Sequence, residues 1–248
     1  MAIDKAKLAK VADAERQDVD FLRKKAADSA KDVKGTVANN LAGTLRLIGV
    51  ADYVVGNSPD LFKAGVSEAA MLRSKLFERF DAGDGVSPSY VSMLSYKALL
   101  NALAAGNEQV ARSLASRMGG RSDVEREYDR SFDVAFGYAL KSIVLSDFES
   151  ASQWVDALYV ECKDAENADF VGYAQVLRAI LDASQADADA GLKEIVTGHE
   201  RQCSGKGLFK DTEDELLCVW GVAVANLARM RGVQVGPVEP LIPADLLI

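Results

Sequence analysis

Apolar side chains recur along most of this chain every three or four residues, the spacing that places them on one face of a helix. Residues 4–33 carry a thin apolar stripe among many charges, which predicts a long exposed helix. Residues 36–55 predict a buried helix. Ser58 and Pro59 then provide an N-cap and a first helical proline for a helix that continues to about residue 80.

From residue 90 onward the chain repeats a pair of helices joined by a short turn. In the first pair, an apolar helix reaches Gly106 and Asn107, and a second helix follows around Leu114. The second pair places Trp154 forty residues after Leu114, and a weaker third copy extends over residues 170–196. A period near 40 with one helical pair per unit is typical of a tetratricopeptide-like α-solenoid, in which neighbouring pairs stack to bury their apolar faces.

The most hydrophobic segment lies near the end of the chain. Thr212 and Glu215 match a capping box, and residues 216–228 leave almost no polar face, which predicts a buried helix over residues 212–231. A tail with three of the chain's five prolines follows. We expect this helix to close the stack and the tail to lie back across the last hairpin as a cap.

Together these patterns predict an all-α protein of stacked αα-hairpins, a solenoid of about nine or ten helices. Residues 1–34 form a charged N-terminal helix in this prediction, and residues 35–248 form a single helical-repeat domain. No segment shows the sustained alternation that is typical of strands.

The net charge of −8 comes mainly from one region. Residues 147–200 hold twelve acidic and three basic side chains, which gives that region a charge of −9. These carboxylates disfavour nucleic acid as a partner and would attract a basic protein surface. A solvated face that keeps the protein soluble is the alternative. The candidate partner-binding residues are Asp147, Glu149, Asp182, Asp187, Asp189 and Glu194.

The cysteines and the N-terminal residues indicate a cytoplasmic protein. The three cysteines form an odd set without framework spacing, as is usual in a reducing compartment. The charged first 34 residues lack the apolar core of a signal peptide, and no apolar run is long enough to span a bilayer. We therefore expect no association with a membrane.

No residue pattern argues for catalysis, a metal or a cofactor. His199 and Cys203 lie four residues apart and fall on one helix face, but with only Cys218 beyond them they lack the four ligands that zinc requires. A packed or helix-capping histidine is the simpler interpretation. Gly205 and Lys206 lack the rest of a phosphate loop. We expect a protein that is not an enzyme and that holds no metal and no cofactor.

The last 60 residues carry a family resemblance, which extends in outline from about residue 90. Its features are Leu181 and Asp182 before an acidic turn, His199, the loop 204–209, the apolar helix and the tail 240–247. With these features the chain resembles the Immunity protein 49 family, one of the families of polymorphic-toxin immunity proteins. Glu239 stands where the family's tail usually has an aspartate. A second immunity group, which opposes PoNe-type DNases, has a comparable helical body.

This resemblance implies that the protein neutralises a cognate toxin delivered by a bacterial secretion system, such as a type VI system. The implied mechanism is tight binding that covers the toxin's active site, without turnover. The acidic region suits this expectation, because toxin domains that act on nucleic acids are commonly basic and complementary charge speeds capture. The alternative function is that of a helical-repeat adaptor or regulator that binds another protein or a peptide.

Overall fold

The computed structural model describes residues 3–248, and these fold into eleven α-helices without a β-sheet, which confirms the all-α prediction. The helices are α1 (Lys5–Ala26), α2 (Thr36–Val54), α3 (Pro59–Asp81), α4 (Tyr96–Ala104), α5 (Glu108–Arg117), α6 (Ser122–Tyr128), α7 (Ser131–Leu145), α8 (Phe148–Glu161), α9 (Val171–Leu181), α10 (Gln185–Gln202) and α11 (Val219–Met230). Short 3₁₀ turns occur at η1 (Pro88–Tyr90), η2 (Met93–Ser95), η3 (Ala168–Phe170), η4 (Glu213–Leu216) and η5 (Ala244–Leu246).

The predicted hairpins are present as the pairs α4–α5, α7–α8 and α9–α10. Each turn ends in the same way, with a residue of positive φ followed by the N-cap of the second helix. The positive-φ residues are Gly106, Ser146 and Ala183. The N-caps are Asn107, Asp147 and Ser184, and each side chain accepts a hydrogen bond from the backbone N–H three residues later. These local signals reverse the chain and satisfy exposed helix-end donors at the same time.

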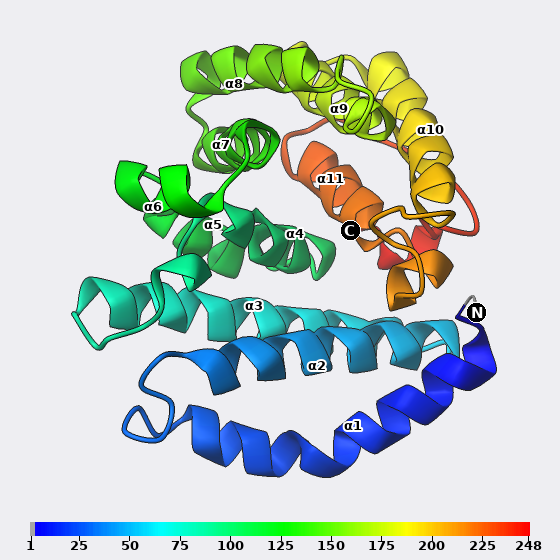
Figure 1. The fold of residues 1–248 in the computed structure, drawn as a ribbon. Coiled ribbons are helices and arrows are strands. Elements are labelled where there is room, and N and C mark those ends of the chain that lie inside the picture. Colours follow the sequence, from blue (N-terminus) through cyan, green and yellow to red (C-terminus); the bar gives the residue numbers. More distant parts are fainter. Residues whose placement is uncertain (1–2) are drawn as a thin grey trace.

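The hairpins curve around α11 and do not end with it (Figure 1). Helices α1, α2 and α3 form one side of the molecule, and the three later hairpins continue from it as an arch. Helix α11 runs inside this arch, where it packs against α4, α9 and α10. The prediction that this helix closes the end of the stack is therefore wrong. Its surface is apolar on all sides, and only an interior position surrounds it with apolar partners.

The last helix also begins later than predicted, and the capping box at Thr212 does not form. The Thr212 hydroxyl donates to the carbonyl of Phe209, and the carboxylate of Glu215 accepts from the backbone N–H of Asp211. Residues 213–216 form the turn η4, and α11 starts only at Val219. Arg46 of α2 forms ion pairs with two acids of this turn, Glu213 and Asp214, and so holds the segment against α2.

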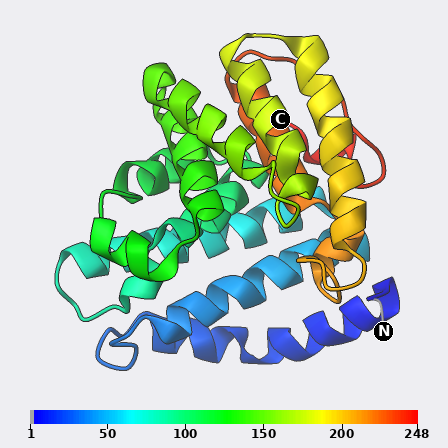
Figure 2. The ribbon, with the colours of Figure 1, turned by 45° about the horizontal axis from the view of Figure 1, so that its top comes forward.

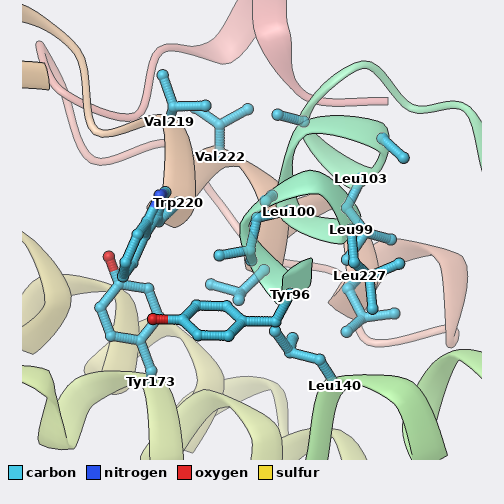
Figure 3. Packing of buried hydrophobic residues seen from close by; sticks show 14 of the residues in the cluster. Tyr96, Leu99, Leu100, Leu103, Leu140, Tyr173, Val219, Trp220, Val222 and Leu227 are labelled. Carbon is cyan, nitrogen blue, oxygen red and sulfur yellow. The ribbon is translucent and has the colours of Figure 1, made fainter. Parts of the chain in front are cut away.

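An aromatic cluster around Trp220 forms the centre of the core (Figure 3). Trp220 of α11 is 5% exposed, and its ring centroid lies 5.6 Å from that of Tyr96 and 5.3 Å from that of Phe209. The ring centroids of Phe136, Phe170 and Tyr173 each lie 6.2 Å from that of Trp220. The cluster joins α4, α7, α9 and the loop before η4 to α11, so side chains from distant parts of the sequence share one core.

The N-terminal helix is shorter than predicted. Helix α1 ends at Ala26, and turns that include the buried Asp32 occupy the segment up to α2. The Asp32 carboxylate accepts from the backbone N–H groups of Val37 and Ala38 and so caps α2. Apolar residues of α1, Leu8 among them, are buried in the common core.

The C-terminal tail contacts the last hairpin at its start. The backbone N–H of Gly236 donates to the Asp189 carboxylate on α10. The tail then crosses α11, where Ile242 packs beside Gly221, and ends with Ile248 beside Gly106 at the α4–α5 turn. The predicted contact with the last hairpin is present, but most of the tail covers α11 and the middle of the arch.

Candidate functional site

The acidic residues of the second and third hairpins, α7–α8 and α9–α10, lie at one edge of the fold. The α7–α8 turn and the α9–α10 turn lie at the same end of neighbouring hairpins, because successive helices run antiparallel. Arg178 near the end of α9 agrees with this antiparallel register, since it donates to Ser152 in the first half of α8 and forms an ion pair with Asp156 one turn further on. Figure 2 shows α9 and α10 side by side, with their connecting turn at the top of the view. We call this surface the acidic edge and define it by Asp147, Glu149, Asp182, Asp187 and Asp189.

Three of these five carboxylates have structural roles. Asp147 caps α8 by accepting from the Ser150 N–H, and that hydrogen-bonding lowers the pKa of Asp147. Asp187 accepts from the Ser184 hydroxyl, which itself caps α10. Asp189 holds Gly236 of the tail at 3.0 Å. The sequence could not separate these roles from a role in partner binding, because a capping acid and a surface acid look alike in a sequence.

The other two members, Glu149 and Asp182, are exposed, and their carboxylates form no hydrogen bond or ion pair with any residue in the range 3–248. Their charge is directed to solvent rather than to a partner within the fold. Asp182 and Asp187 line a cavity of about 330 Å³ together with Tyr159, Gln175 and Arg178. Arg178 is the cation of this cavity and is already paired with Asp156, so it does not neutralise Asp182.

Glu194 does not belong to the acidic edge. It lies seven residues after Asp187 on α10, which corresponds to about 10 Å along the helix axis. Its carboxylate forms an ion pair with Arg201, and Arg201 also binds Asp169. The structure therefore groups five of the six predicted acids and places the sixth in an ion-pair network on the same helix.

An exposed aromatic residue stands among the acids and was missed by sequence reasoning. Phe148 is the first residue of α8, lies between Asp147 and Glu149, and is 51% exposed. Large apolar side chains in such positions are enriched in protein interfaces. Its hydrophobicity resembles that of the many buried residues of this chain, so its exposure became visible only in the folded protein.

The only histidine of the chain is a packed structural residue, as its sequence context indicated. His199 is 3% exposed, stacks on Phe209 at 4.5 Å, and donates from Nε2 to the backbone carbonyl of Asp214 at 2.7 Å. Burial lowers the pKa of His199. Burial raises the pKa of Cys203 to about 11 and that of Cys218 to about 12, so both thiols stay protonated at neutral pH.

Comparison with known proteins and a search for metal sites add two findings. No protein-family model, curated protein or solved structure matches this chain. Among residues 3–248, no group of three or more acids, histidines and cysteines is arranged to hold a metal ion. Over the same range, every helix is too short or too polar to cross a lipid bilayer.

Proposed function

We propose that this protein is an immunity protein that binds and inhibits a cognate toxin in the cytoplasm of the cell that produces both. Its acidic edge contacts a basic surface of the toxin, and tight binding covers the toxin's active site. The proposal joins the resemblance to the Immunity protein 49 family with one structural observation. That observation is the placement of five acidic residues at the same end of two neighbouring hairpins, with the exposed Phe148 between two of them, Asp147 and Glu149.

The arrangement of this edge supports binding to a protein. An exposed aromatic ring supplies an apolar anchor, and the surrounding carboxylates accelerate encounter with a basic partner and disfavour acidic ones. The turns are held rigidly by the caps at Asp147 and Ser184, so little conformational entropy is lost when a partner binds. A preorganised charged surface of this kind suits an inhibitor that must capture its target quickly.

Co-expression tests this proposal directly. The gene for a toxin encoded beside this protein is expressed from an inducible promoter in a susceptible bacterium, with and without the immunity gene. We expect growth to be restored only when this protein is present, and we expect the two proteins to elute as one complex in size-exclusion chromatography. Continued growth arrest, with this protein soluble and present in excess, would overturn the proposal.

A further inference from the structure

The segment that directly follows α11, residues 231–236, contacts both hairpins that carry the acidic edge. Arg231 at its start donates hydrogen bonds to the end of α7, and Gly236 at its end donates one to α10. Gly232, with a φ of +84°, turns the chain away from α11 between these two contacts. A segment of six residues therefore joins the α7–α8 hairpin to the α9–α10 hairpin.

Arg231 caps the C-terminus of α7 immediately before the turn to α8. Its Nε donates to the carbonyl of Ile143 at 3.0 Å, and its Nη2 donates to the carbonyl of Val144 at 2.7 Å. The last four carbonyls of a helix have no partner within the helix, and an arginine can satisfy them. The Ile143 carbonyl also accepts from the backbone N–H of Ser146, a hydrogen bond that closes the α7–α8 turn. Arg231 thus holds the end of α7 at the point where this turn begins.

The other end of the segment is tied to the first half of α10. The backbone N–H of Gly236 donates to the Asp189 carboxylate at 3.0 Å. Arg229 of α11 holds the residue before Gly236, because its Nε and Nη2 both donate to the carbonyl of Val235, at 3.0 and 2.6 Å. The Val235 side chain is 3% exposed and belongs to the common core. The segment therefore reaches Asp189 along a path that α11 and the core fix.

This link adds to the direct contact between the two hairpins. Arg178 of α9 pairs with Asp156 and so joins the consecutive helices α8 and α9. Residues 231–236 join α7 and α10, the first and the last helix of the two hairpins. A binding surface formed by two separate turns fits one partner only while the turns keep their spacing, and rigid support reduces the entropy lost on binding.

We propose that residues 231–236 are a positioning element that fixes the two turns of the acidic edge relative to each other. This inference rests on the proposed function of that edge. Arg231 acts through the end of α7, and Asp189 acts by accepting the hydrogen bond from Gly236. The affinity for the toxin therefore depends on the oxygen that Asp189 offers to Gly236 as well as on its charge.

Two substitutions of Asp189 separate its hydrogen bond from its charge. Asp189→Asn and Asp189→Ala remove the same charge, but only the asparagine keeps an oxygen that can accept from the Gly236 N–H. In surface plasmon resonance we expect Asp189→Ala to bind the toxin about threefold to tenfold more weakly than Asp189→Asn, the range for loss of one hydrogen bond. Equal affinities of the two variants would assign Asp189 to charge alone and overturn the proposal.

Hydrogen–deuterium exchange of the full chain without the toxin tests the positioning itself. We expect residues 145–149 and residues 183–189 both to exchange about tenfold faster in Arg231→Met than in wild type, because Arg231 loses two hydrogen bonds from a charged donor. If this variant fails to fold, Asp189→Ala is measured in the same way at residues 145–149, which Asp189 does not contact. Unchanged exchange there would refute the inference.

Arg121→Met is the matched control for Arg231→Met. The Arg121 side chain is 18% exposed, against 11% for Arg231, and it likewise donates to a carbonyl at a helix end, that of Arg117 in α5. Its ion pair with Asp81 lies on α3, away from the acidic edge. We expect Arg121→Met to leave exchange at both turns unchanged. Equal acceleration in the two variants would show a general loss of stability and no positioning role.

The two measurements separate failure of this inference from failure of the proposed function. A wild-type protein that does not bind the toxin overturns the proposed function. In that case the exchange experiment, which contains no toxin, still decides whether residues 231–236 position the two turns.

Discussion

The backbone N–H of Ile248 donates to the side-chain Oδ1 of Asn226 at 3.1 Å, which ties the end of the chain to the middle of the interior helix α11. Asn226 is fully buried, and its Nδ2 reaches three backbone carbonyls within 3.3 Å. Two of these, at Leu103 and Ala104, belong to the end of α4, and the third belongs to Leu246 in the tail. One amide therefore joins α4, α11 and the tail.

Replacing this amide should loosen all three elements. We expect Asn226→Ala to lower the free energy of unfolding by at least about 2 kcal/mol, because it leaves several buried backbone groups without partners. Urea denaturation monitored by circular dichroism measures the change. Asn40→Ala, at an exposed position of α2, is the control and should stay within about 0.5 kcal/mol of wild type. Equal midpoints for the two variants would contradict the role assigned to Asn226.

Trp220 should be one of the most costly residues to truncate. We expect Trp220→Ala to destabilise the protein by about 3–5 kcal/mol, because the substitution leaves a cavity among several aromatic rings. Trp154, which is partly buried and stacks on Tyr138 at 4.6 Å, provides the comparison, and its truncation should cost less. Differential scanning calorimetry measures both, and a wild-type melting temperature for Trp220→Ala would refute the central position of this ring.

Acidification should destabilise the protein through His199. Nε2 donates to a carbonyl, so Nδ1 is the site of protonation, and Nδ1 is buried without a hydrogen-bond partner. Burial lowers the folded-state pKa below the unfolded value of about 6.5, so the unfolded state takes up the proton first. The free energy of unfolding therefore has its full value above about pH 6.5, and it decreases as the pH drops from there through the folded-state pKa.

Urea midpoints between pH 7.5 and pH 5.5 measure this dependence. We expect His199→Gln to be less stable than wild type at pH 7.5 but to show a flatter pH profile over this window. The carboxylates titrate mostly below it and affect both proteins alike. Parallel profiles for the two proteins would show that another group is responsible.

The two unpaired acids of the acidic edge are the best probes of partner binding. We expect the double substitution Glu149→Lys and Asp182→Lys to slow association with the toxin and to reduce the dependence of the association rate on salt. Stability should change little. A lysine at the start of α8 is unfavourable to the helix dipole, but one just beyond the end of α9 is favourable.

Surface plasmon resonance at several salt concentrations checks the rate. The control carries the same change in charge on other helices, as Asp18→Lys with Asp123→Lys, two exposed acids of α1 and α6. Unchanged kinetics in the edge variant would show that the acidic edge serves solubility alone.

Phe148 tests whether the same edge makes close contact with the toxin. We expect Phe148→Ala to accelerate dissociation and to weaken binding by about tenfold or more, as is usual for an aromatic residue at the centre of an interface. Phe21 of α1, 64% exposed, is the matched control, and Phe21→Ala should bind as wild type. If both variants dissociate at the wild-type rate, the interface lies on another face.

Much of the local structure was readable from the sequence because it depends on neighbouring residues. The pairs Gly106–Asn107 and Ser146–Asp147 each combine a positive-φ residue with a helix cap, so these hairpin turns are encoded within a few residues. The apolar composition around Trp220 likewise showed that its helix is buried, since no polar face remains to meet water. The concentration of acids after residue 147 was also a property of the sequence alone.

Contacts between residues far apart in the chain were decided only by the tertiary structure. Arg46 lies 168 residues before Asp214, and their ion pair holds the turn η4 against α2. The local capping box had predicted that a helix begins in this segment. The acids of the edge separated into capping and free residues only through packing. Periodicity shows which face of a helix is buried but not which helix covers it. The interior place of α11 and the charges left without partners were therefore beyond any sequence pattern.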